Sequence, residues 1–146
     1  MPGVTNQKEG EMIKSAQLSK EIVVTVSNKI GVLAEMSKLV ADHGINIDAV
    51  AGYAANDEAK IMLVTGDNLR IVDALKKAGY KAIKEEEVVV LDLENKPGAL
   101  KNITAGLAGQ GIDIKHVYGT VCAGGCPAKI VLSTSDNEKA LVTFKK

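Results

Sequence analysis

The chain of 146 residues is 46% hydrophobic and 25% charged, which is the composition of a globular protein with one medium or two small domains. Basic and acidic residues both number 18, and with 3% aromatic residues there is neither a basic tract nor a base-stacking platform, which argues against nucleic-acid binding. No stretch of about 18 apolar residues occurs and the start is polar, so we expect no membrane span and, with two cysteines, a cytoplasmic protein.

Residues 1–19 are polar and show no sustained period, so we expect a flexible N-terminal extension. Residues 20–27 (KEIVVTVS) are a β-branched run typical of a strand. A turn follows at residues 28–31, and apolar residues at positions 33, 36 and 40 then fall on one face of a helix. We expect Gly44 to end that helix in the left-handed conformation.

The first half continues with strands at residues 45–54 and 59–66. Asp67 or Asn68 can cap a second helix, which ends near Gly79 and leads into a strand at residues 80–84. The resulting order, βαββαβ, is that of a ferredoxin-like unit, in which two helices cover one face of a four-stranded antiparallel sheet.

The same order restarts at residue 87, after the charged stretch Glu85–Glu87, which we expect to be solvated. The second half shows a strand at 87–94, a turn at 95–98, a helix, strands at 112–121 and 128–134, and a helix start at 136–141. It contains no clear fourth strand. Either that sheet edge is open, or the terminal residues or another chain cover it.

The two halves repeat one another in sequence. NKIGVL at residues 28–33 returns as NKPGAL at residues 95–100, an offset of 67 that becomes 69 after a lengthened hairpin. The repeat predicts an α+β chain of two ferredoxin-like βαββαβ units, the second truncated at its C-terminus. The expected boundaries are 1–19 for the extension, 20–86 for the first unit and 87–146 for the second.

The repeated turn suits a small zwitterionic ligand. The start of a helix presents unpaired N–H groups and a partial positive charge to a carboxylate, and Asn28 and Asn95 add amides that donate and accept. Asp48, Asp113 and Asn46 are candidate partners for an ammonium group. Alternatively, the turn is only a helix cap and a chain reversal.

These segments resemble the ACT domain, a small-molecule-binding regulatory module. The pattern NKPG-L…GI-I is present as NKIGVLAEMSKLVADHGINI and NKPGALKNITAGLAGQGIDI, and the resemblance covers about residues 20–146. It implies two ACT domains in tandem that bind an amino acid at interfaces between paired domains. By position, the implied ligand contacts are Asn28, Gly31, Val32, Leu33, Asn46 and Ile47 in the first copy and Asn95, Gly98, Ala99, Leu100, Asp113 and Ile114 in the second. The first copy departs from the pattern at Ile30, where the second has Pro97.

Two cysteines, Cys122 and Cys126, lie in the lengthened hairpin of the second half. They could serve as a redox pair or as metal ligands, with His116 nearby, but two thiols and one histidine fall short of the four ligands of a structural zinc site. The simpler interpretation is a glycine-rich loop with two incidental small residues. We expect no metal and no cofactor.

No GxGxxG, GxxxxGK[ST], HExxH or GxSxG motif is present, so no residue set proposes catalysis. The first hypothesis is a non-enzymatic regulatory protein that binds an amino acid as its effector and acts on a separate enzyme or regulator. Open sheet edges and small cores favour a homodimer. The alternatives are a structural or protein-interaction module without ligand, and a thiol- or metal-binding protein using Cys122 and Cys126.

Overall fold

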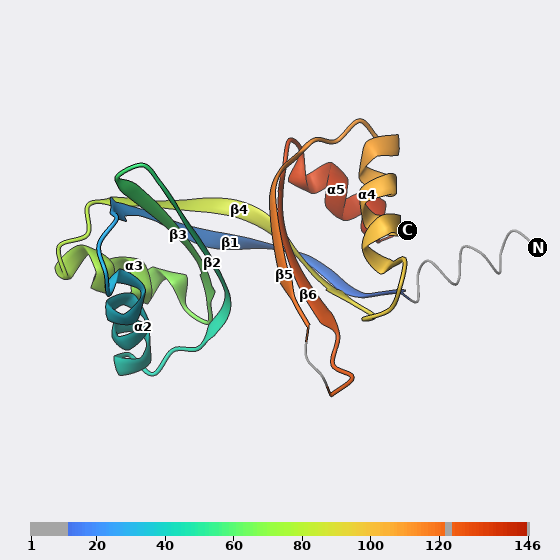
Figure 1. Cartoon of the computed structure of the whole chain (residues 1–146). Helices are drawn as coiled ribbons and strands as arrows, with labels where there is room; N and C mark the ends of the chain where they lie inside the picture. Colours follow the sequence, from blue (N-terminus) through green and yellow to red (C-terminus); the bar gives the residue numbers. More distant parts are fainter. Residues whose placement is uncertain (1–11, 122–123, 146) are drawn as a thin grey trace, which may run out of the picture. The chain divides into compact units, whose positions relative to one another are not determined.

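The structure, a computed structural model, describes residues 12–121 and 124–145. Their strands are β1 (Ile13–Ser27), β2 (Ile47–Ala55), β3 (Glu58–Thr65), β4 (Ala82–Leu93), β5 (Ile114–Thr120) and β6 (Ala128–Thr134). Their helices are α2 (Val32–Asp42), α3 (Asn68–Lys77), α4 (Ala99–Gly109) and α5 (Asn137–Phe144) (Figure 1). The strands are hydrogen-bonded in the order β2-β3-β1-β4-β6-β5.

The chain divides into two compact units. The first unit is Lys20–Glu86, and the second combines the described residues up to Ser19 with those from Glu87 onward. Both units are α+β, with antiparallel strands and two helices each, so the expected ferredoxin-like fold class is confirmed.

The core of the first unit lies between its sheet and helices α2 and α3. Alternate residues of β1 and β3 point toward the helices because successive side chains of a strand face opposite sides. The helices meet them with apolar residues at helical spacing. The buried members of this core are Ile22, Val24, Met36, Val40, Ile61, Leu63, Ile71 and Leu75.

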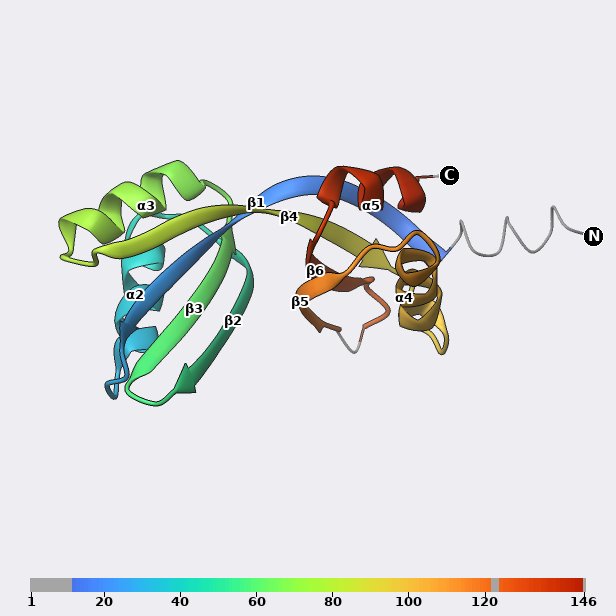
Figure 2. The same cartoon turned by 90° about the horizontal axis from the view of Figure 1, so that it is seen from above.

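The second unit builds an equivalent core with α4 and α5. The ribbons of these two helices can be followed in Figure 2. Its strands β4 and β6 pair from Val89↔Leu132 to Leu93↔Ala128. The buried members include Val89, Leu91, Leu93, Ile103, Leu107, Leu132, Ala140 and Phe144, together with Ala16 from β1.

The fourth strand of the second unit comes from the start of the chain. Residues 13–19 are the first half of β1 and belong to the second unit, whereas residues 20–27 are the second half and belong to the first. The expectation that residues 1–19 form a flexible extension is therefore wrong for residues 13–19. They are held because strand pairing with β4 and the burial of Ala16 fix their backbone.

The strand β4 also runs through both units without a break. It spans Ala82–Leu93, so the separate strands expected at 80–84 and 87–94 are one strand. The side chains of Glu85, Glu86 and Glu87 are exposed, as their charge requires, but their backbone is part of the strand.

A repeated asparagine contact joins the sheet to the second helix of each unit. The Asn68 Oδ1 accepts hydrogen bonds from the backbone N–H and the hydroxyl of Thr65, and its Nδ2 donates to the carbonyl of Lys20 at 2.8 Å. Asn137 makes the same three bonds, to Thr134 and to the carbonyl of Glu87. These asparagines therefore hold β1 and β4 at the residues where each strand passes between units.

The helix ends settle one choice that the sequence left open and confirm one prediction. Asp67, and not Asn68, caps α3, since its carboxylate accepts from the backbone N–H of Arg70 at 3.2 Å. Gly44 follows the end of α2 with φ 68°, so its expected left-handed conformation is confirmed.

Candidate functional site

Each repeated turn places a left-handed glycine directly before a helix. Gly31 precedes α2 with φ 95°, and Gly98 precedes α4 with φ 89°. These values lie in the region that side chains rarely adopt, which explains why both copies carry glycine there. The turn therefore brings the chain from a strand into a helix within a few residues at equivalent points of the two units.

The space beside both glycines is open. A Cβ atom built on Gly31 or on Gly98 would meet no described atom within 4 Å. In the described part of the chain no side chain caps α2 or α4 at these glycines. The start of each helix thus lies beside a free space with its partial positive charge behind it, which favours a carboxylate, and in α4 the N–H of Ala99 already donates to the carbonyl of Lys96 at 3.3 Å.

The two asparagines of the turns are exposed and leave the helix ends uncapped. The backbone N–H of Asn28 donates to the carbonyl of Asp57 at 2.8 Å, which ties the first turn to the loop between β2 and β3. The amides of Asn28 and Asn95 point into solvent instead of capping, so capping does not explain why this residue stands in both turns.

The apolar candidates divide into two groups. Val32, Ile47 and Ile114 are half-buried against the cores, and Ala99 is buried among the core residues of the second unit. Leu33 and Leu100 are instead about half exposed, at 50% and 49%. The first group positions the turns, whereas these two leucines offer apolar surface beside each glycine.

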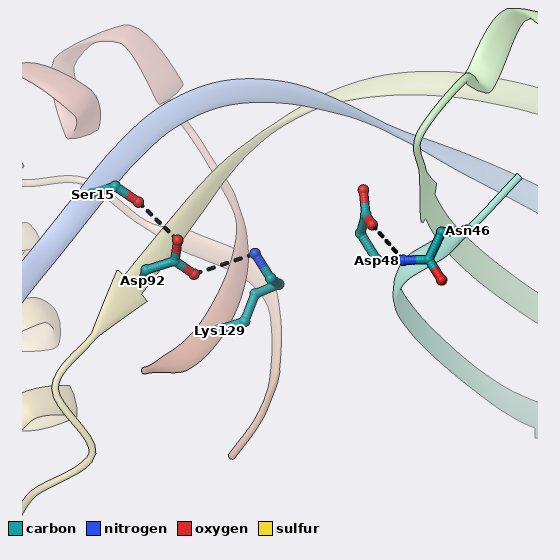
Figure 3. A network of polar contacts seen from close by, with 5 residues as sticks. All are labelled: Ser15, Asn46, Asp48, Asp92 and Lys129. Atoms are coloured by element: carbon teal, nitrogen blue, oxygen red, sulfur yellow. Dashed lines mark hydrogen bonds and ion pairs between the residues drawn. The ribbon is translucent and has the colours of Figure 1, made fainter. Parts of the chain in front are cut away.

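The polar candidates lie at the start of the strand that follows the first helix. The Nδ2 of Asn46 donates to the Oδ1 of Asp48 at 3.0 Å, so this carboxylate already holds an amide (Figure 3). Asp113 is exposed, and its backbone N–H donates to the Ser135 hydroxyl at 2.9 Å. These contacts fix Asp48 and the Asp113 backbone at the beginnings of β2 and β5.

Three polar residues that sequence reasoning missed meet on the sheet of the second unit. Figure 3 shows Asp92 between Ser15, whose hydroxyl donates at 2.9 Å, and Lys129, whose ammonium lies 3.2 Å from the other carboxylate oxygen. Asp92 and Lys129 are register partners in β4 and β6. Ser15 belongs to β1, which no local pattern assigned to this unit.

A second carboxylate, Glu94, lies beside the second turn. One oxygen is 2.7 Å from the ammonium of Lys96, and the other is 3.4 Å from that of Lys14. The hydrogen bond from Lys96 lowers the pKa of Glu94, burial opposes this, and Lys14 adds to the lowering. The carboxylate therefore stays ionised and joins the turn to the start of β1.

In the first unit the neighbourhood of the turn is built differently. The hydroxyl of Tyr80 donates to the Oε1 of Glu35, in the first turn of α2, at 2.8 Å. Burial, followed by this hydrogen bond and the charge of Glu35, raises the pKa of Tyr80 to about 12. Residue 94 of the second unit corresponds to Ser27, so the first turn has no carboxylate at that position.

The cysteine hairpin is only partly described. Cys122 lies outside the described residues, and no cysteine within them is a free thiol. Across residues 12–121 and 124–145 no three histidine, cysteine or acidic side chains are grouped as metal ligands would be. The metal hypothesis gains no support from these residues.

Comparison with known proteins identifies part of the chain. Residues 20–79 match the model of the ACT domain family, so the first unit contains an ACT domain. The matched segment contains the turn at Gly31 but stops before the second unit. No curated protein matches the chain.

Several solved structures are similar over nearly the whole chain. A protein of Bacteroides thetaiotaomicron is 25% identical with a TM-score of 0.81, covering 89% of this chain and 88% of its own. The ligand-free regulatory subunit of aspartate kinase from Thermus thermophilus is 13% identical with a TM-score of 0.65, covering 91% and 96%. The structure of aspartokinase alpha and beta subunits is 18% identical with a TM-score of 0.63, covering 91% and 93%.

At these identities the two kinase structures establish a shared fold. In the described part of this chain, no helix is long and apolar enough to cross a membrane.

Proposed function

We propose that this chain is a non-catalytic regulatory protein that binds an amino acid at the turns preceding α2 and α4. One observation carries the proposal: a left-handed glycine opens a free space before an uncapped helix, at equivalent positions of two units, one of which contains an ACT domain. Gly44 and Gly111 at helix ends also lie beside open space, so what distinguishes the two turns is that their open space lies at the start of a helix, where the partial positive charge favours an anion.

We propose further that the second unit is also an ACT domain. Support comes from the repeat of individual contacts. Both units have the glycine turn, the same three bonds of an asparagine (Asn68 and Asn137), and a bulge early in the strand after the first helix, at residues 47–49 and 114–116. These shared contacts support the same domain fold in both units.

In the proposed binding mode the carboxylate of the amino acid accepts hydrogen bonds from backbone N–H groups of the first helical turn, after Gly31 in the first unit and after Ala99 in the second, where the N–H of Ala99 donates to Lys96. Leu33 or Leu100 contacts the apolar part of the ligand, because both are about half exposed beside the glycine. The ammonium group needs an acidic or carbonyl partner, and the candidates are the exposed Asp48 and Asp113 of a paired unit, because within its own unit each aspartate is separated from the glycine by a helix of 11 residues.

The protein would act as a homodimer on a separate enzyme. Strands β2 and β5 are the outermost of the strand order, so each leaves a row of backbone groups available for a second copy. A regulatory subunit of aspartate kinase has nearly the same length as this chain, which supports control of a catalytic protein that is not covalently attached. A ligand that binds one association state better than another would shift the population between them.

Thermal melts against each of the twenty amino acids test this proposal. A ligand at 100 times its Kd stabilises the folded state by about 2.7 kcal/mol, which raises the melting temperature measurably. One or a few amino acids should do so for the wild type. The shift should shrink in Gly31→Leu or Gly98→Leu, because a side chain would fill the open space.

Melts of the variants without ligand are the control for folding. A flat panel on the folded wild type would leave the structural or interaction module as the better interpretation. Equal shifts in the wild type and in both variants would place the ligand elsewhere.

A further inference from the structure

The first helix of each unit is held near its start by a side chain from the same place in the fold. Four residues after Gly31, Glu35 accepts a hydrogen bond from Tyr80 at 2.8 Å. Four residues after Gly98, Asn102 donates from Nδ2 to the sulfur of Met12 at 3.0 Å. In both cases the backbone N–H of the held residue closes the first helical turn onto the glycine carbonyl.

The residue that bonds to the helix start comes from the same continuous segment in the first unit and from a distant part of the sequence in the second. Tyr80 lies just before β4, the fourth strand of the first unit. Met12 lies just before β1, which supplies the fourth strand of the second unit from the start of the chain. The second turn therefore depends on a segment 90 positions away from Asn102, as the separation of the hydrogen-bonded residues shows.

Further contacts join the same segment to the turn itself. The backbone N–H of Glu94 donates to the carbonyl of Met12 at 2.7 Å. The Glu94 carboxylate lies between the ammonium groups of Lys14 and Lys96. Lys96 then accepts, through its carbonyl, the N–H of Ala99 at 3.3 Å, at the first residue of α4. A continuous set of contacts thus runs from the N-terminal segment to the helix start.

We propose that residues 12–15, the N-terminal segment, position the Gly98 turn for ligand binding, with Met12, Lys14 and Glu94 as positioning residues. This inference rests on the proposed function, which it deepens by making the two sites unequal. Binding at the Gly98 turn and docking of the segment stabilise each other, because each favours the same arrangement of the turn. The Gly31 turn has Ser27 at the position of Glu94 and is independent of the segment.

The contacts that hold the N-terminal segment are weak and sensitive to salt. A thioether is a weak hydrogen-bond acceptor, and the Lys14 and Glu94 side chains are 54% and 27% exposed, so salt screens their attraction. Binding at the Gly98 turn should therefore weaken with rising ionic strength more than binding at the Gly31 turn.

The test uses the full chain with Lys14→Met, which removes the ion pair of the segment with Glu94 and leaves that of Lys96, and separately Met12→Ala. The matched control is Lys77→Met, which breaks an exposed ion pair of similar length in the first unit, 3.0 Å to Asp73. The first readout is amide hydrogen exchange without ligand. Exchange at residues 95–102 should rise at least about fivefold in the two test variants, and residues 28–35 should be unchanged.

The second readout is the affinity of any amino acid that stabilises the wild type. Its Kd at the Gly98 turn should rise by at least about fivefold in the test variants and stay constant in Lys77→Met. Unchanged exchange at residues 95–102 would overturn the inference whether or not an amino acid binds. Raised exchange with no amino acid bound by the wild type would support the positioning role while refuting the proposed function.

Discussion

The asparagine contact of the first unit offers a prediction whose size follows from the structure. Replacing Asn68 by alanine removes two hydrogen bonds to Thr65, at 3.0 and 2.6 Å, and one to the carbonyl of Lys20 at 2.8 Å. Thr65 is only 9% exposed, so water reaches its freed donors poorly. The end of β3 and the carbonyl of Lys20 in β1 therefore both lose a partner.

Each of the three bonds contributes about 0.5–1.5 kcal/mol net, and a freed group that stays buried adds to the loss. We therefore expect Asn68→Ala to destabilise the first unit by about 2–4 kcal/mol. Asn137→Ala should do the same in the second unit, because its three bonds have nearly the same lengths.

Urea unfolding monitored by hydrogen exchange measures both effects, since each unit can be followed through its own core amides. Asn95→Ala is the matched control, because its side chain is exposed and should change stability by less than about 0.5 kcal/mol. A loss below about 1 kcal/mol in both Asn68→Ala and Asn137→Ala would refute the reasoning. So would a loss that appears in the wrong unit.

Three further predictions concern the strands and Tyr80. Ala16→Glu should lower the free energy of unfolding of the second unit by at least about 3 kcal/mol, because it buries an unpaired charge in that core. Hydrogen-exchange protection of the second unit should fall with it, and protection equal to that of the wild type would contradict the assignment of residues 13–19 to this sheet. Gly119→Ala should destabilise the folded state by about 1–3 kcal/mol in a thermal melt, since its Cβ would collide with the Cδ1 of Ile130 and lie 2.9 Å from the backbone oxygen of Lys129. Gly52→Ala is the matched control, because the nearest atom to its Cβ would be 3.6 Å away, and it should leave stability nearly unchanged. Equal losses of stability in the two variants would show that crowding at Gly119 is not the cause. Tyr80→Phe should lose about 0.5–1 kcal/mol near pH 8 through the bond to Glu35. The raised pKa makes that difference constant below pH 10 and smaller as the pH rises through about 12, so a difference that grows with pH would contradict it.

Local sequence patterns predicted helices and strands well where a residue type favours one backbone conformation. The β-branched runs formed strands, and the glycines at positions 44, 79 and 111 adopted the left-handed conformation at helix ends. The repeat of the NKxG turn located both candidate sites before any geometry was known. These predictions succeeded because few other residue types suit a buried strand or a left-handed backbone conformation.

Residues 13–19 were beyond such reasoning for a physical reason. Only Ala16 of this stretch is buried, so its hydrophobic pattern is too sparse to indicate a strand. The strand exists because β4, far along the chain, offers it hydrogen-bonding partners. The open choice for the missing edge was therefore decided by pairing between distant segments.

The role of the repeated asparagine was visible in sequence but ambiguous. Asn68 and Asn137 recur at the offset of the repeat, yet asparagine serves equally well as a helix cap. The structure assigns the cap to the preceding aspartate and gives the asparagine a contact with a strand in the same unit. Similarly, the bridge of Glu94 between Lys14 and Lys96 requires knowing that residue 14 lies beside the second turn.

The central claim is that an amino acid binds at the glycine turns, and the backbone amides there can report it directly. Two-dimensional ¹H–¹⁵N spectra should be recorded while the amino acid identified by thermal melts is titrated into the protein. The claim predicts saturable shifts of the Gly31, Val32, Gly98 and Ala99 amides, larger than those of the core. Shifts confined to other regions, or none at concentrations that stabilise the fold, would contradict it.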